Sequence, residues 1–441
     1  MKVEQLNLAN FRSFEQIELA FEPDVNVIAG VNGVGKSGIL QALAALFSRA
    51  LPEFTLSTAR PLSFTDEDIH HGKPSLEASA IFTVADQQCH MGTQRLRGDG
   101  DSGDRWNSFW QKAYEARAAA KPTTFSEMLA ARTFTGNLEA GKVEIEQALR
   151  ALKERPHQPL CIYFSPRRQL PGRPRSLPKP APFEPRSAYQ FALDDRDVNL
   201  REFMHWFRWQ ELQARKGEAH AKRMLATLQE VVTRFVPEFT DLRIEDKPTL
   251  RFLVEKNDTP LALNQLSDGE RGLLAVIFDI TRRLAIANPA LDDPIAAGEA
   301  IILIDEVELH LHPGWQRQVL RRFTETFKNC QFIVTTHSPQ VLGEVKSRCI
   351  RYLLHEDDKS ISWTPPRAFG LDSSRVLEEL MDVKARNAEI DNALGELFQT
   401  IDDEDFAAAE QRIETLKATL GENDPELTRA RALMAFLKGV E

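Results

Sequence analysis

The stretch Gly30-Val31-Asn32-Gly33-Val34-Gly35-Lys36-Ser37 decides the fold of this chain. It fits the pattern G-x-x-x-x-G-K-[ST] at every fixed position. The apolar residues before it are typical of a short buried strand, and the apolar spacing of three to four residues from 38 to 47 is typical of a helix. In that context glycines let successive backbone N–H groups surround a phosphate, and the helix N-terminus adds its partial positive charge. The stretch therefore predicts a phosphate-binding loop rather than a glycine turn that binds nothing.

Two side chains at the end of this stretch suit a nucleotide with its magnesium ion. Lys36 would reach the β- and γ-phosphates, and the Ser37 hydroxyl would ligate Mg²⁺. The candidate nucleotide ligands in the loop are Gly30, Asn32, Gly33, Val34, Gly35, Lys36 and Ser37.

The composition is typical of a globular protein in aqueous solution. The 441 residues allow two or three domains, and 42% of them are apolar and 27% charged. No apolar run approaches the roughly 18 residues that span a bilayer, and the N-terminus is typical of an amphipathic strand rather than a signal peptide. Four cysteines lie far apart without a C-x-x-C pair. This spacing favours a location in the reducing cytoplasm, and it argues against a structural zinc site. With a net charge of −10, nucleic-acid binding would need a local basic patch.

The N-terminal part alternates between apolar and polar side chains, as strands do. Residues 3–8 and 17–21 predict two strands joined by a turn, and residues 76–84 predict an antiparallel strand, so the expected core is a mixed sheet. Farther on we expect a helical insertion, with helices at about 106–120 and about 138–154. Its aromatic side chains would pack locally or form a partner surface; they are Trp106, Phe109 and Trp110.

A basic, proline-rich segment follows the buried strand predicted at 160–164. Against one acid, Glu184, it carries the bases Arg167, Arg168, Arg173, Arg175, Lys179 and Arg186. Its two interpretations are a solvated loop and a tract, 167–186, that contacts nucleic-acid phosphates. Residues 197–236 predict helices, and their heptad pattern is too short for an extended coiled coil; their expected core is Phe203, Trp206, Phe207 and Leu212.

In the C-terminal half, acids and a histidine follow predicted strands. The apolar run 300–304 is typical of a buried parallel strand, and it ends in Asp305 and Glu306, at the edge where open α/β sheets bind ligands. Asp305 would hold Mg²⁺ beside the phosphate loop, and Glu306 would act as general base on the attacking water. His337 follows the next predicted strand and suits a γ-phosphate contact.

The stretch Leu266-Ser267-Asp268-Gly269-Glu270 precedes an apolar face typical of a helix. Ser267 and Glu270 have capping-box spacing, which predicts that the helix starts here. Taken alone, the stretch is compatible with an ordinary capped helix.

Five motifs, in this order, resemble those of the ABC-type ATPases of the RecF/SMC group. They are Asn10-Phe11-Arg12-Ser13-Phe14, the phosphate loop, the 266–270 signature, the Asp305-Glu306 pair and the His337 loop. Residues 306–313 are similar to a subgroup of OLD-like and phage-defence ATPases. The resemblance covers roughly 1–90, 160–170 and 240–365. It implies an α/β fold: an ABC-type P-loop NTPase head with a mixed sheet, a helical insertion and a C-terminal helical tail.

The resemblance also implies a homodimer, or a higher even oligomer, in which two copies enclose two ATP molecules with Mg²⁺. Signature residues of one copy would contact the γ-phosphate held by the other copy; these residues are Ser267, Gly269 and Glu270. His337 matches the family's switch histidine, Arg12 would lie near the nucleotide, and Gln169 is the candidate for the glutamine that ligates Mg²⁺. The signature departs from LSGGQ at Asp268 and Glu270, which is familiar in this group and does not imply loss of hydrolysis.

The C-terminal segment distinguishes between relatives. Residues 366–441 predict a helical tail, in which Gly421 ends one helix and Asp424-Pro425 begins the next. The segment lacks the spread of acids of a TOPRIM domain, and the sequence lacks the His/Cys cluster of an HNH nuclease. With Gly370-Leu371-Asp372, the tail instead resembles the PtuA-like ATPases of Septu and retron defence systems.

We expect the chain to divide into an ATPase core at 1–90 and 240–365, a helical insertion at 91–159, a core strand with basic loop and helical lobe at 160–239, and a helical domain at 366–441. The resemblance implies an ATP-hydrolysing dimeric switch that controls an effector nuclease in antiphage defence. The alternative is a RecF-like DNA-binding ATPase of DNA repair, which would use the 167–186 tract. An ABC transporter motor is disfavoured by the RecF-like N-terminus and by the lack of a membrane span.

Overall fold

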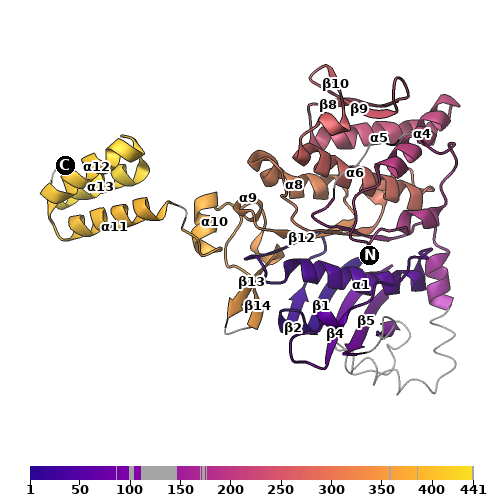
Figure 1. The fold of residues 1–441 in the computed structure, drawn as a ribbon, viewed down its shortest axis with the longest axis horizontal. Coiled ribbons are helices and arrows are strands. Elements are labelled where there is room, and N and C mark those ends of the chain that lie inside the picture. Colours follow the sequence, from indigo (N-terminus) through magenta and orange to yellow (C-terminus); the bar gives the residue numbers. More distant parts are fainter. Residues whose placement is uncertain are drawn as a thin grey trace. The chain divides into compact units, whose positions relative to one another are not determined.

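The computed structural model describes residues 1–85, 87–98, 104–110, 147–168, 170, 174, 176–356, 359–384 and 386–439. The chain forms two compact units, Met1–Leu371 and Asp372–Glu441 (Figure 1). In the first unit, helix α1 (Lys36–Phe54) lies between two sheets and contacts strands of both, whereas the second unit is helical.

A six-stranded sheet holds the strands that lead into the predicted site. Its order is β14-β13-β3-β12-β11-β7, and every neighbouring pair is parallel except β13 with β14. Side chains of β7, β11 and β12 are all buried, because a parallel sheet covered on both faces needs continuous apolar runs. Its strands are β3 (Val25–Gly30), β7 (Leu160–Phe164), β11 (Ala300–Ile304), β12 (Cys330–Thr336), β13 (Ile350–Glu356) and β14 (Lys359–Trp363). The parallel strands end at one edge, so the segments that follow them meet there.

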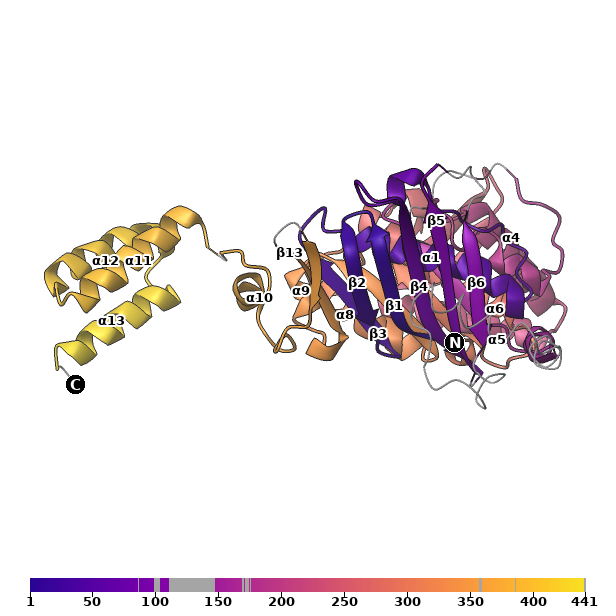
Figure 2. The same cartoon turned by 90° about the horizontal axis from the view of Figure 1, so that it is seen from below.

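An antiparallel sheet of order β2-β1-β4-β5-β6 packs on the other side of α1 (Figure 2). Its strands are β1 (Lys2–Phe11), β2 (Phe14–Ala20), β4 (Ser75–Val84), β5 (Gln87–Leu96) and β6 (Arg105–Trp110). The strands predicted at 3–8, 17–21 and 76–84 are therefore confirmed. They lie in a sheet separate from the phosphate-loop strand, however, and the mixed sheet is the six-stranded one.

The helix predicted at 106–120 is wrong over its described residues. Residues 105–110 form strand β6, which pairs with β5 and places Asn107 opposite Gly92. The Trp106 indole N–H donates to Glu53 Oε1 at 2.8 Å, so this aromatic side chain packs locally. Residues 147–153 are helical, as predicted for the end of the 138–154 helix, and residues 111–146 lie outside the described residues.

Helices and a small sheet cover the other face of the six-stranded sheet. As predicted for 197–236, α4 and α5 are helices, and the rings of Phe203 and Phe278 stack with their centroids 4.0 Å apart. The longer helices are α4 (Leu200–Arg215), α5 (Ala219–Phe235), α6 (Asp268–Ala287) and α8 (Pro313–Thr326). The small sheet is β8 (Phe239–Glu245), β9 (Arg251–Lys256) and β10 (Thr259–Ala262). Short helices are η1 (Asp66–Asp68), η3 (Pro185–Tyr189), η4 (Leu263–Gln265), α7 (Pro294–Ala297), α9 (Pro339–Leu342) and η5 (Ser347–Cys349).

The second unit has its own small hydrophobic core. Its helices are α10 (Ser373–Glu379), α11 (Ala388–Asp402), α12 (Phe406–Leu420) and α13 (Pro425–Leu437). As predicted, Gly421 ends α12 with a φ of +88°, and Asp424 caps α13 by accepting from the N–H groups of its first turn. The buried core consists of Leu394, Leu397, Ile401, Ala409, Ile413, Leu416, Leu427, Ala430 and Met434.

Cys89, Cys161, Cys330 and Cys349 are free thiols, and all are buried. No helix in the described part of the chain is long and apolar enough to cross a membrane.

Candidate nucleotide-binding site

The phosphate loop connects β3 to α1 and depends on its glycines. Gly30, Gly33 and Gly35 have φ values of +143°, +81° and +106°, which side chains other than glycine rarely adopt. A Cβ on Gly35 would lie 2.6 Å from the Phe14 ring, and one on Gly30 would lie 2.5 Å from the Leu353 carbonyl oxygen. The loop backbone can therefore approach a ligand in this shape only with glycine at these positions.

Lys36 stands at the start of α1 with its ammonium turned back over the loop. Its Nζ donates to the carbonyl oxygens of Gly30 at 3.0 Å and Val31 at 2.8 Å. An ammonium has three N–H donors, so one is left for a phosphate. Burial lowers the pKa of Lys36 to about 8, while Asp305 and Glu306 act in the opposite direction. The group is therefore charged at neutral pH.

A pocket of about 430 Å³ brings the predicted motifs together. It is lined by Arg12, Ser13, Asn32, Gly33, Gly35, Lys36, Ser37, Gly38, Asp305, Glu306 and His337. Two of the candidate loop ligands lie outside this lining: the Gly30 carbonyl accepts the Lys36 hydrogen bond, and the Val34 carbonyl accepts from Ser13 Oγ at 3.2 Å. Gln169, the candidate glutamine, lies outside the described residues.

The acidic pair after β11 is held by Thr335, a buried residue of β12 that sequence reasoning missed. The Thr335 hydroxyl donates to Asp305 Oδ1 at 2.5 Å and accepts from the Glu306 N–H at 2.7 Å. Asp305 is 2% exposed, whereas Glu306 is half-buried and has a φ of +49°, a left-handed conformation that is uncommon for a non-glycine residue. One hydroxyl therefore fixes the backbone of the candidate base and one oxygen of the candidate metal ligand.

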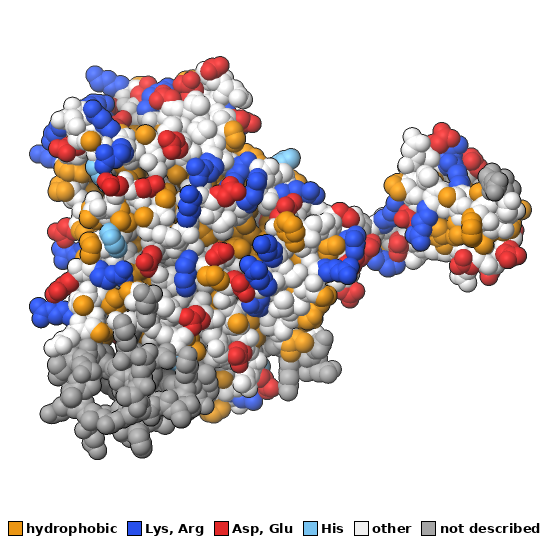
Figure 3. All heavy atoms as spheres, turned by 180° about the vertical axis from the view of Figure 1, so that it is seen from behind, with side chains coloured by type: hydrophobic (Ala, Val, Ile, Leu, Met, Phe, Trp, Pro, Cys, Tyr) orange, Lys and Arg blue, Asp and Glu red, His pale blue; other side chains and the backbone are white. Residues whose placement is uncertain are grey.

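Arg168 was placed by the sequence in the basic tract, and that interpretation is wrong for this residue. It is 5% exposed, and its guanidinium donates to the main-chain carbonyls of Asp305 and Glu306. Burial lowers its pKa to about 10, and the acids at 305, 306 and 308 oppose that shift. Elsewhere in the tract Arg186 pairs with Glu184 at 2.5 Å, and residues 173 and 175 lie outside the described residues. Over the face shown in Figure 3, acidic and basic side chains are interspersed.

His337 follows β12, and its backbone is held by Glu308, another residue that the sequence analysis does not identify. Glu308 accepts from the His337 backbone N–H at 2.6 Å and from the Thr336 hydroxyl at 2.8 Å. Burial, followed by the charge of Lys36, lowers the pKa of His337 below its ordinary value. The imidazole is therefore neutral at neutral pH and has one N–H donor and one acceptor.

Arg12 lines the pocket from the turn between β1 and β2. Its Nε donates to Asp68 Oδ1 at 2.9 Å and its Nη1 to Gln41 Oε1 at 2.6 Å. Its side chain is 38% exposed. The guanidinium therefore stands at the solvent side of the pocket, steered by two polar partners.

The signature residues lie outside the pocket lining. Ser267 caps α6 in the predicted capping box and is exposed. Glu270 is 6% exposed, and its carboxylate accepts from the Ser267 N–H and hydroxyl and pairs with Lys256 at 2.6 Å. A Cβ on Gly269 would lie 2.3 Å from the His310 carbonyl oxygen, so the helix tip packs against the loop after β11. Within one chain, then, Glu270 stabilises the helix start.

A phosphate loop, an acidic pair and a histidine at adjacent parallel strand ends, with a separate capped signature helix, define an ABC-type P-loop ATPase fold. Residues 25–343 match the family described as "AAA domain, putative AbiEii toxin, Type IV TA system", and the chain belongs to this family.

Parts of the chain are similar in sequence to named proteins. A "Retron Ec83 probable ATPase" of Escherichia coli is 40% identical over 203 residues, which cover 46% of this chain and 36% of the relative. The "Septu protein PtuA" of Bacillus mycoides is 33% identical over 97 residues, or 22% of this chain and 13% of the relative. A "DNA replication and repair protein RecF" of Renibacterium salmoninarum is 50% identical over 48 residues, or 11% and 12%. The chain thus spans about a third or less of the length of these relatives.

Among solved structures, an SMC head bound to the C-winged helix domain of ScpA matches with a TM-score of 0.46 and 16% identity. The match covers 82% of this chain and 98% of that structure.

Proposed function

We propose that the protein binds ATP with Mg²⁺ and hydrolyses it to ADP and phosphate. The observation that carries the proposal is the single pocket into which the phosphate loop, Asp305, Glu306 and His337 all project. A serine hydroxyl and a carboxylate, from Ser37 and Asp305, are the hard oxygen donors that suit Mg²⁺, and Gln169 is the proposed third protein ligand. Bound there, Mg²⁺ supplies charge neutralisation to the β- and γ-phosphates.

In the proposed reaction Glu306 is the general base. It takes a proton from a water whose oxygen forms a bond to the γ-phosphorus, while the bond from that phosphorus to the β,γ-bridging oxygen breaks and its electrons remain on ADP. Lys36 stabilises negative charge on the phosphates. The neutral His337 contacts the γ-phosphate as a hydrogen-bond donor, and Arg12 lies near the rest of the nucleotide.

We propose that two copies complete each site. Ser267 is exposed at the N-terminus of α6, a helix of 20 residues, where the partial positive charge favours an anion. Because it does not line its own chain's pocket, a contact with a γ-phosphate requires a second chain. ATP would therefore close a homodimer, or a higher even oligomer, and hydrolysis would open it.

The biological role that we propose is control of an effector, a nuclease, in antiphage defence within the cytoplasm. Its support is the likeness to proteins named as a retron ATPase and as Septu PtuA. The DNA-repair alternative is supported by the short likeness to RecF. This alternative is disfavoured by Arg168, whose side chain points into the protein, so that the proposed nucleic-acid-binding tract lacks one of its basic residues.

The experiment uses Glu306→Gln, which keeps the size of the side chain but removes the base. This variant should bind ATP with wild-type affinity, lose phosphate release and accumulate as a dimer, measured by light scattering after gel filtration. Lys36→Ala, the control, should bind no ATP, and adding ATP should leave its oligomeric state unchanged. Hydrolysis at the wild-type rate by Glu306→Gln would overturn the proposed mechanism. For the role, we expect a nuclease to be encoded beside this gene and to copurify with the chain; a neighbourhood of replication genes would instead favour the DNA-repair alternative.

A further inference from the structure

Arg168 is a buried cation that forms no ion pair within the described residues. Its guanidinium donates to three main-chain carbonyls, those of Ser165, Asp305 and Glu306. A buried charge without a carboxylate is unfavourable unless its hydrogen bonds are well placed. The hydrogen bonds to these carbonyls are therefore what stabilises the buried charge of Arg168.

Those carbonyls belong to the acidic pair of the proposed site. Glu306 has left-handed backbone geometry, which a non-glycine residue keeps only where its surroundings hold it. Arg168 contacts the carbonyl oxygens before and within this turn, and Thr335 accepts from the Glu306 N–H on the other side, at 2.7 Å. The peptide groups that orient the Glu306 side chain are therefore fixed from two sides.

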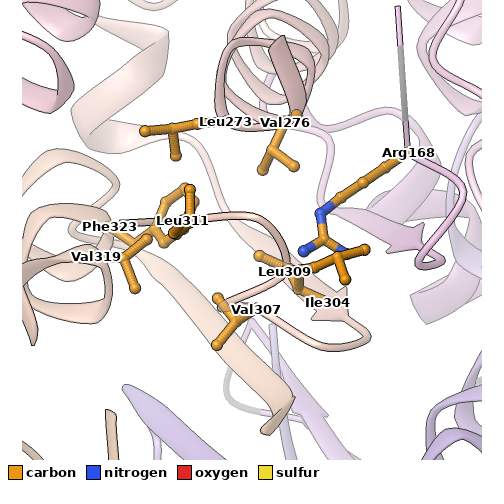
Figure 4. A pocket seen from close by; sticks show the side chains of 10 residues that line it. Arg168, Leu273, Val276, Ile304, Val307, Leu309, Leu311, Val319 and Phe323 are labelled. Carbon is orange, nitrogen blue, oxygen red and sulfur yellow. The ribbon is translucent and has the colours of Figure 1, made fainter. Parts of the chain in front are cut away.

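Arg168 also lies between this turn and the signature helix. In Figure 4 its side chain extends toward Ile304 and Leu309, beside Val276 of α6. These residues line a cavity of about 10 Å³ that is otherwise apolar. Gly272, also in α6, lies close to this segment, since a Cβ built on it would come within 3.8 Å of the Arg168 carbonyl oxygen. A displacement of α6 would thus reach the segment that carries Arg168.

We propose that Arg168 is a positioning residue that holds the Glu306 backbone in its reactive conformation and couples the signature helix α6 to it. This inference rests on the proposed function of Glu306 as general base. The planar guanidinium donates from two separate nitrogens, Nη1 to the Asp305 carbonyl and Nη2 to the Glu306 carbonyl. A lysine would have to reach both carbonyls from a single nitrogen at the end of a shorter side chain.

The test compares Arg168→Met, which keeps the apolar stem, and Arg168→Lys, which keeps the charge, with Arg167→Ala, a change at the exposed neighbour. We expect kcat for ATP hydrolysis to fall about tenfold or more in both Arg168 variants, with ATP affinity within about threefold of the wild type. Arg167→Ala should leave both quantities unchanged. If Arg168→Met fails to fold, Arg168→Lys carries the comparison, since its kcat should fall while ATP binding persists.

A double-mutant cycle separates positioning from general stability. In the Glu306→Gln background, adding Arg168→Lys should not lower the residual rate further, because Arg168 acts through Glu306. A wild-type kcat for Arg168→Lys, or equal and additive losses in both backgrounds, would overturn the inference. If Glu306→Gln itself keeps full activity, the proposed function fails; if Glu306→Gln is inactive while Arg168→Lys is fully active, only the present inference fails.

Discussion

Replacing Thr335 by valine removes one hydroxyl and keeps the shape of the side chain. In the native protein that hydroxyl makes two hydrogen bonds, a buried one at 2.5 Å to Asp305 and a partly buried one at 2.7 Å from the Glu306 N–H. Valine fills the same space but leaves the carboxylate without a donor and the N–H without an acceptor. The substitution thus tests the positioning of the acidic pair with little change in packing.

The expected size of the effect follows from these two bonds. A neutral hydrogen bond contributes about 1 kcal/mol and one to a charged group about 1.5–3 kcal/mol. Their sum, about 2.5–4 kcal/mol, corresponds to a roughly 10²- to 10³-fold lower kcat if it is fully expressed in the transition state. Since Thr335 does not line the pocket, ATP affinity should change by no more than about threefold.

The assay measures phosphate release under saturating ATP, with binding of a fluorescent ATP analogue and thermal unfolding recorded for the same samples. Thr335→Ser is the matched control: it retains the hydroxyl, loses one methyl group and should keep kcat within about threefold of the wild type. A folded, ATP-binding Thr335→Val protein with wild-type kcat would refute the reasoning, because both hydrogen bonds would then be irrelevant to catalysis.

Three further predictions concern other parts of the molecule. ATP affinity should fall by up to about tenfold per pH unit above pH 8, because Lys36 has a pKa of about 8 in the folded chain and loses its charge there. ATP-binding titrations at pH 7, 8 and 9 measure this, and an affinity that does not change with pH would contradict it. Lys256→Met should weaken the proposed ATP-dependent dimer about tenfold or more in sedimentation experiments, because it leaves the buried Glu270 carboxylate without its ion-pair partner, whereas Lys256→Arg should not. Leu397→Ala should cost about 2–5 kcal/mol and unfold the C-terminal unit, seen as rapid proteolysis beyond residue 372, while ATP hydrolysis by the other unit persists.

The opposite pH effect is expected for the stability of the ATP-free protein. The pKa of Lys36 is lower in the folded chain than its ordinary 10.5, so the unfolded chain binds more protons between pH 8 and 10.5. The contribution of Lys36 to the free energy of unfolding therefore rises with pH across that window. In denaturant titrations, the free energy of unfolding of the wild type relative to that of Lys36→Met should therefore increase between pH 8 and 10.5, and a constant difference would contradict this.

Candidate site residues could be located from the sequence where they lie in one contiguous stretch directly after a strand. The phosphate loop, Asp305-Glu306 and His337 could be located because an apolar run precedes each, and the parallel order brings those strand ends to one edge. Ser267 and Glu270 could be recognised as a capping box because that motif is local. The same spacing could not show that Lys256 engages the Glu270 carboxylate.

Other features depend on contacts between distant residues. Arg168 meets Glu306 across 138 positions of sequence, and Thr335 meets Asp305 across 30, so no local pattern announces either contact. Residues 105–110 were misjudged because the aromatic spacing at 106, 109 and 110 imitates a helix period. Pairing with β5 prevails there, since aromatic residues also suit strands.

The buried thiols make the native chain convenient for spectroscopy. Burial raises the pKa of Cys161 and of Cys330, the latter to about 12, and the thiolate is the form that reacts with maleimide dyes. A single cysteine introduced at the exposed Asn264, close to the start of α6, would therefore take up a fluorophore far faster than the native thiols. In the proposed dimer, energy transfer between two such dyes would follow the approach and separation of the two signature helices in real time, with every native residue but one retained.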